Sequence, residues 1–200
     1  MFTKILLIGT LTSSLLLAQN SLPKDATSIG IELNPLTILA IGDDSKDTAF
    51  SGAISLFDNI NASEIALSVA YEKEYSDLFG INGSSIVAEV MDVSLHYRKF
   101  ARAKTNGFYY GGFTAYTYLD GQLKNDTRLA TVEKFGIGAE IGFRLMKTES
   151  DWSVYWGPSF KIGRYFGSDN NVFESNSLGM LLYDKDLFID IDFFRVGFRF

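Results

Sequence analysis

Residues 135–145 read FGIGAEIGFRL, and apolar side chains alternate there with polar or very small ones. The even positions carry three glycines together with Glu140 and Arg144. The apolar side chains occupy the odd positions: Phe135, Ile137, Ala139, Ile141, Phe143 and Leu145. Because successive side chains of a β-strand point to opposite faces, this period of two predicts a strand with one apolar face and one polar face.

The same alternation recurs in seven further segments, which makes eight predicted strands. The further segments are 29–34, 50–56, 65–72, 87–97, 108–119, 152–162 and 187–200. Segment 108–119 is aromatic on both faces, so its phase stays open. In 187–200 the apolar parity changes near Phe193 and Phe194, which predicts a β-bulge at that point.

Longer and shorter connections alternate between these strands. The longer ones are 42–48, 74–86, 120–130 and 167–186, and the shorter ones are 58–62, 101–106 and 147–151. Short turns at one end and long loops at the other are typical of outer-membrane barrels. The pattern therefore predicts an all-β fold, an eight-stranded antiparallel up-and-down transmembrane β-barrel with both termini at the short-turn end.

Alternation alone does not say which face looks inward, since a soluble barrel of the lipocalin kind places its apolar face inside. Here the glycines of 135–145 share a face with the charges, which suits the narrow interior of an eight-stranded barrel. Trp152, Tyr71 and Tyr97 lie near strand ends, as in the aromatic girdles of membrane barrels. These features favour an apolar face turned toward lipid.

The N-terminus has the pattern of a secretory signal peptide. A positive start over residues 1–4 precedes an apolar run over 5–17 and then Ala18. The run is shorter than the ~20 residues that a spanning helix needs, which disfavours a membrane anchor. We therefore expect a signal peptide at 1–18, a mature barrel at 19–200, and a location in the cell outer membrane.

Composition excludes several classes of function. The chain has no cysteine, so disulfides, thiolate metal sites and cysteine catalysis are absent, and its single histidine, His96, rules out a His-rich metal site. A formal net charge of −6 argues against a nucleic-acid partner. We expect no cofactor and no metal.

The chain ends in FFRVGFRF, with apolar residues at every second position. Those positions are Phe194, Val196, Phe198 and Phe200. This ending resembles the C-terminal signature of Gram-negative outer-membrane proteins, and the mature chain resembles small barrels of the OmpA-transmembrane or OmpX type. The resemblance implies that the barrel assembly machinery recognises the last strand, and that outer-membrane lipid and lipopolysaccharide surround the barrel.

With the apolar faces outside, charges of both signs are expected inside the barrel. The predicted lumen network consists of Glu32, Glu72, Asp92, His96, Arg98, Glu140, Arg144, Lys161, Arg195 and Arg199. Buried charges need partners, so a plug of ion pairs is one interpretation and a selective pore is the other. The narrow bore of eight strands favours the plug.

Asp92, Ser94 and His96 share one face of a predicted strand and suggest a hydrolase. However, the spacing is only that of consecutive same-face residues, and a lumenal pair does not easily meet a lipid ester, so we favour a polar plug. The predicted loops are acidic, for example at Asp43 and Asp44, and 167–186 contains apolar clusters that suggest a hairpin or a partner site.

The sequence thus predicts a non-enzymatic barrel with a structural or surface-interaction role and an unidentified surface ligand. The alternatives are a lipid-modifying outer-membrane enzyme and a narrow channel for small solutes.

Overall fold

The computed structural model of this chain describes residues 26–35, 48–76, 86–102, 105–123, 128–146, 152–167 and 187–200. The predicted signal peptide, Asp43, Asp44 and the 168–186 connection lie outside the described residues. No helix in the described ranges is long and apolar enough to cross a membrane.

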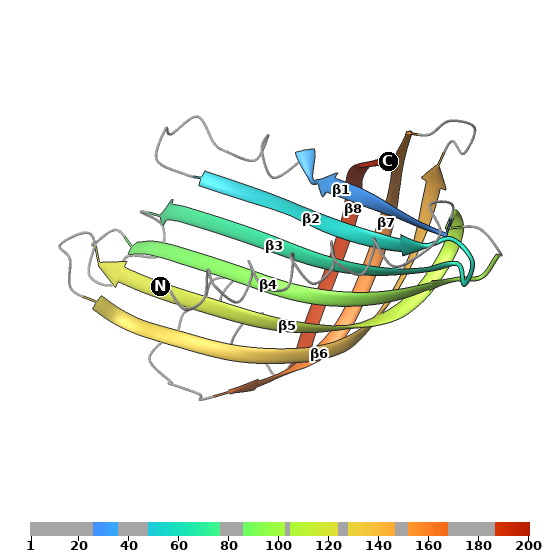
Figure 1. The fold of residues 1–200 in the computed structure, drawn as a ribbon. Coiled ribbons are helices and arrows are strands. Elements are labelled where there is room, and N and C mark those ends of the chain that lie inside the picture. Colours follow the sequence, from blue (N-terminus) through green and yellow to red (C-terminus); the bar gives the residue numbers. More distant parts are fainter. Residues whose placement is uncertain are drawn as a thin grey trace.

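Eight strands pair with their chain neighbours and close into a barrel (Figure 1). Their bounds are β1 Thr27–Leu33, β2 Thr48–Asp58, β3 Ser63–Ser76, β4 Ile86–Phe100, β5 Gly107–Leu123, β6 Arg128–Met146, β7 Ser153–Gly167 and β8 Leu187–Arg199. Every pairing is antiparallel, including the closing pair of β1 and β8. The predicted all-β, eight-stranded, antiparallel up-and-down barrel is confirmed.

The two ends of the barrel differ. The ends of β2, β4, β6 and β8 share one end of the barrel with the start of β1 (Figure 1). At this end the carbonyl of Phe200 accepts a hydrogen bond from the amide of Ile29 at 2.9 Å. We call this the short-turn end. The ends of β1, β3, β5 and β7 lie at the other end of the barrel, which we call the long-connection end.

One predicted connection is wrong in length. The sequence suggested a break over 120–130, but β5 continues to Leu123 and β6 begins at Arg128, with Asp120 paired to Thr131. Apolar and polar residues alternate in the sequence only where one face of a strand meets an apolar environment and the other does not. Where the hairpin continues with polar residues, its backbone hydrogen bonds also continue, but the sequence no longer alternates.

Side-chain exposure shows which face is outside. Ile137 and Ile141 on β6 are 51% and 47% exposed, whereas Glu140 between them is 1% exposed. The same contrast runs around the barrel, where most of the large apolar side chains point outward and the buried side chains include eight charged ones: Glu32, Glu64, Arg98, Lys134, Glu140, Arg144, Lys161 and Asp192. The chain therefore has the reverse of the arrangement found in a soluble barrel.

A register shift between β7 and β8 matches the predicted bulge. Gly157 pairs with Arg195 and Ser159 pairs with Asp192, so the single Pro158 faces Phe193 and Phe194. Both phenylalanines are exposed, while Asp192 is buried. The extra residue in β8 lets two aromatic neighbours point outward and keeps Asp192 and Arg195 both on the inner side.

Two glycines on the inner face are required by aromatic rings that cross the interior. A Cβ atom on Gly142 would lie 2.3 Å from the Tyr109 ring, and one on Gly197 would lie 2.2 Å from the Tyr155 ring. Tyr109 and Tyr155 are both buried. Small residues thus share the inner face with charges because large side chains from neighbouring strands need the space.

Candidate functional site

Five charged side chains meet inside the barrel and form what we call the ion-pair cluster. Its members are Glu32 of β1, Glu64 of β3, Arg98 of β4, and Glu140 and Arg144 of β6. Each is at most 4% exposed. Since these strands lie on different sides of the barrel, the cluster spans its interior.

The two arginines link the three glutamates. Arg98 binds Glu140 through Nε at 2.8 Å and Glu64 through Nη1 at 3.0 Å. Arg144 binds Glu64 through Nη1 at 2.6 Å and Glu32 through Nη2 at 2.7 Å. Glu64 therefore bridges both guanidinium groups, and charge-assisted hydrogen bonds of this length are the stronger kind.

Aromatic rings surround the Arg144 guanidinium. Its Cζ atom lies 4.4 Å from the centroid of Tyr155, 5.1 Å from that of Phe57 and 5.4 Å from that of Phe100. A flat, weakly hydrated guanidinium stacks on such rings, which adds to the ion pairs. Rings and charges together fill the interior near the short-turn end.

Strand β8 extends the cluster on its other side. Arg195 contacts Glu32 at 3.4 Å and also binds Asp192, which in turn accepts a hydrogen bond from Asn34 Nδ2 at 3.1 Å. The β-bulge produces this arrangement, because it places Asp192 and Arg195 on the same side of the strand.

A second chain of contacts runs from the cluster toward the long-connection end. His96 Nδ1 lies 3.1 Å from Glu140 Oε2, and His96 Nε2 lies 3.1 Å from Ser68 Oγ. Ser68 Oγ lies 2.9 Å from Ser94 Oγ, which donates to Asp92 at 3.0 Å. Polar side chains of β3, β4 and β6 are thereby joined in one network.

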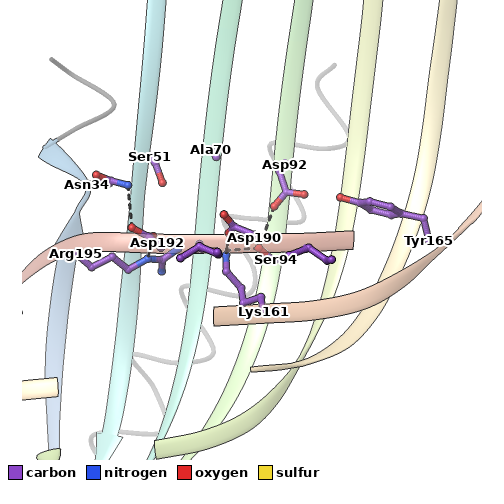
Figure 2. A pocket seen from close by; sticks show the side chains of 13 residues that line it. Asn34, Ser51, Ala70, Asp92, Ser94, Lys161, Tyr165, Asp190, Asp192 and Arg195 are labelled. Atoms are coloured by element: carbon purple, nitrogen blue, oxygen red, sulfur yellow. Dashed lines mark hydrogen bonds and ion pairs between the residues drawn. The ribbon is translucent and has the colours of Figure 1, made fainter. Parts of the chain in front are cut away.

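Beyond this chain the interior opens into a cavity of about 340 Å³ (Figure 2). Ser51, Ser68, Ser94 and Asp92 line one side of it. Other lining residues are Lys161 and Tyr165 of β7 and Asp190, Asp192 and Arg195 of β8. In Figure 2 the carboxylate of Asp92 and the ring of Tyr165 lie on neighbouring parts of the wall.

Nine of the ten predicted lumen residues divide into three groups. Glu32, His96, Arg98, Glu140 and Arg144 belong to the contacts just described, with Arg195 at their edge. Two others lie in the cavity wall: Asp92, and Lys161 bound to Asp190 at 2.6 Å. Arg199 lies nearer the short-turn end, where its Nη1 donates to Thr105 at 3.0 Å.

Glu72 differs from this prediction, because it is exposed near the long-connection end of β3. Its position in the alternation of β3 places it on the inner face. The alternation shows on which face a residue lies, but not how far along the barrel it lies. Of the four residues predicted as an assembly signal, Phe194, Val196 and Phe198 lie in β8 and Phe200 directly follows it, and the three phenylalanines are exposed.

Sequence reasoning missed Glu64 and Ser68. Glu64 was omitted because the predicted strand began at residue 65, although Glu64 has the parity of Ala66 and Ser68. Ser68 was read only as a small polar residue. Its contact with His96 depends on the β3–β4 register, in which Ala66 pairs with His96 and Ser68 with Ser94, and a single sequence does not give that register.

Within the described ranges, no group of three or more His, Asp or Glu side chains is arranged to hold a metal ion. Comparison of the chain with protein-family models and with curated protein sequences finds no match.

Proposed function

We propose that this chain is a bacterial outer-membrane β-barrel whose interior is closed by the ion-pair cluster, with a structural or surface-interaction role. The observation that carries the proposal is the combination of an apolar outer surface with a charged, buried interior. The apolar run over 5–17, which has the pattern of a signal peptide, and the alternating apolar residues of 194–200, which resemble the last strand of small outer-membrane barrels, support the same location.

The outer surface suits a lipid environment. Aliphatic side chains such as Ile137 and Ile141 are about half exposed at mid-strand, and Trp152 and Tyr97 are more than half exposed near the short-turn end. Burial of apolar surface contributes about 25 cal/mol per Å², so such a surface is unfavourable in water and favourable in lipid. A closed barrel also pairs its backbone groups internally, as hydrocarbon requires.

The interior favours a closed barrel over a channel. Eight strands leave a bore that side chains can fill. Here five charged side chains from β1, β3, β4 and β6 meet across it, and Tyr155 and Phe57 pack beside them. An ion passing this level would have to break charge-assisted bonds that are shielded from water.

The two native tryptophans test the membrane location, because both point outward on or next to β7. Trp152 is 63% exposed at the short-turn end, and Trp156 is 45% exposed four positions further along. In vesicles with brominated acyl chains, we expect strong quenching of Trp156 fluorescence in the Trp152→Phe variant. Trp152, studied in Trp156→Phe, should be quenched less because it lies nearer the interface.

Fractionation of a Gram-negative host completes this test, and the protein should be recovered with the outer membrane. Tryptophans that resist brominated lipid and are quenched by aqueous iodide instead, in a protein recovered from the soluble periplasm, would overturn the proposal.

A further inference from the structure

Three side chains beneath the cavity have the arrangement of a hydroxyl nucleophile, its base and an orienting carboxylate. Ser68 Oγ is 3.1 Å from His96 Nε2, and His96 Nδ1 is 3.1 Å from Glu140 Oε2. They come from β3, β4 and β6, which brings together residues far apart in the sequence. Both contacts are within the range expected between nucleophile and base and between base and orienting group.

The ion pair with Arg98 fixes the proton arrangement on the imidazole. Glu140 binds Arg98 Nε at 2.8 Å and is therefore an ionised, acceptor-only carboxylate toward His96. In neutral His96 the proton then resides on Nδ1, and the lone pair of Nε2 points to Ser68. This is the tautomer that a base needs in order to accept a hydroxyl proton. Because Ser94 donates its proton to Asp92, the single proton of Ser68 has two acceptors, Ser94 Oγ and His96 Nε2, and Ser68 is activated when it donates to Nε2.

Ser68 borders the cavity although only 6% of the residue is exposed, whereas the two groups behind it do not border the cavity. Ser68 lines the cavity of about 340 Å³, while His96 and Glu140 are each 1% exposed and are not among its lining residues. The aromatic ring of Phe113 stacks on the imidazole with centroids 5.7 Å apart, which restrains the ring plane. A molecule in the cavity would therefore be able to contact Ser68 but not His96 or Glu140.

We propose that Ser68, His96 and Glu140 form a catalytic relay that hydrolyses small, short-acyl esters in the cavity. Ser68 Oγ attacks the ester carbonyl carbon and gives its proton to His96 Nε2. The C–O bond to the alcohol breaks, and His96 passes the proton to the departing alcohol. Water then attacks the acyl-Ser68 ester and gives a proton to Nε2, which returns it to Ser68 as the carboxylic acid leaves.

The cavity also limits the substrate and supports the negative charge of the intermediate. A volume of about 340 Å³ is near the lower end of ligand pockets and admits only small esters. Lys161 lines the same space, and its ammonium has three donors, of which Asp190 takes one. A cation there would stabilise the charge that develops on the carbonyl oxygen.

A purely structural hydrogen-bond network would have the same distances but an unreactive Ser68. The test therefore uses the full chain, refolded in detergent, with diisopropyl fluorophosphate as the probe and trypsin as the positive control. We expect one phosphoryl adduct per chain, mapped by peptide mass spectrometry to Ser68. We also expect turnover of p-nitrophenyl acetate that falls at least tenfold in S68A.

Two further variants separate activation of Ser68 by His96 from mere access of the probe to a serine. Ser159 is a buried serine of β7 whose Oγ has no hydrogen-bond partner among the described residues. S159A should label at the wild-type rate, and H96Q should lose the adduct although Ser68 is intact. The heat-dependent gel shift of each variant checks folding. If H96Q does not fold, the adduct on wild-type Ser68 and its absence in S68A still decide the matter.

Folded wild-type protein that forms no adduct under conditions that label trypsin would overturn the proposal. An adduct of unchanged rate in folded H96Q would overturn it as well. Neither result depends on whether the barrel resides in a membrane.

Discussion

The two halves of the barrel interior share one sequence pattern and differ in how they are filled. Toward the short-turn end, the ion-pair cluster packs against the rings of Tyr155, Phe57 and Phe100. Toward the long-connection end, hydroxyls and partly exposed ion pairs line an open cavity of about 340 Å³. In one half large side chains fill the interior, and in the other smaller side chains border an open space.

The size of the inward side chains explains this difference. On β3 the inward residues pass from Glu64 at the short-turn end to Ser68 and Ala70 further along, and on β2 they pass from Phe57 to Ser51. Large side chains at one end need the space that glycines such as Gly142 provide. Small side chains at the other end leave the cavity unfilled.

The strongest contrast is expected between a buried arginine of one half and a buried lysine of the other. Arg144→Met keeps apolar contact with Tyr155 but leaves Glu64 and Glu32 short of a cation. We expect the free energy of unfolding to fall by about 3–5 kcal/mol, because uncompensated buried charge is costly. Urea unfolding in detergent, followed by tryptophan fluorescence, measures it.

Lys161→Met is the matched variant, and it should lower the same free energy by no more than about 1 kcal/mol. Its partner Asp190 is 39% exposed in the side chain, so water can solvate the carboxylate that remains. Equal losses in the two variants would show that the halves do not differ in this way.

A single added methyl group in each half tests the same comparison between the two halves, with a smaller expected change in stability. Gly136 and Gly142 both lie on the inner side of β6, one in each half. A Cβ on Gly142 would meet the Tyr109 ring at 2.3 Å, whereas on Gly136 the nearest atom is Tyr165 Cε1 at 3.1 Å. Tyr165 borders the cavity, whereas Tyr109 packs beside the Arg144 guanidinium of the ion-pair cluster.

We therefore expect Gly142→Ala to lower the free energy of unfolding by about 1–3 kcal/mol, the usual effect of overpacking. Gly136→Ala should cost less. Denaturant midpoints of the two variants give the order directly, and a greater loss for Gly136→Ala would contradict the account of the filled half.

The smallest effect concerns the turn that closes the β2–β3 hairpin at the short-turn end. Asp58 Oδ1 accepts hydrogen bonds from the amides of Ile60 at 3.0 Å and Asn61 at 2.9 Å. Asp58→Ala should lower the free energy of unfolding by about 0.5–1.5 kcal/mol, and Asp58→Asn should keep most of it because an acceptor remains. Equal melting temperatures for the two variants would show that these bonds do not stabilise the turn.

Much of the fold could be predicted from the period of two in the sequence. That period identified the strands and, through the parity change at Phe193 and Phe194, the bulge opposite Pro158. The predicted strand limits and inward residues were wrong where apolar and polar residues no longer alternate. The β5–β6 hairpin continues beyond its alternating part, and Glu72 has inward parity but lies at an exposed depth.

The site could be predicted only in part, because its contacts join strands far apart in the sequence. Composition and parity named Arg98, Glu140, Arg144 and His96 as inward residues, but nothing local said which of them meet. Ser68 shows this most clearly. The sequence suggested Ser94 as the neighbour of His96, whereas the register places Ser68 between Ser94 and the imidazole.

Current through single barrels in a planar lipid bilayer tests the central claim most directly, namely that the ion-pair cluster closes the interior. The refolded full chain is inserted at known copy number, with Glu140→Ala as the comparison, because that change removes a carboxylate bound by Arg98 and His96. We predict that the wild-type barrel passes almost no current and that Glu140→Ala passes slightly more while unfolding more easily. Steady wild-type conductance, with an ion selectivity that changes in Glu140→Ala and a stability that does not, would contradict the account and identify a channel.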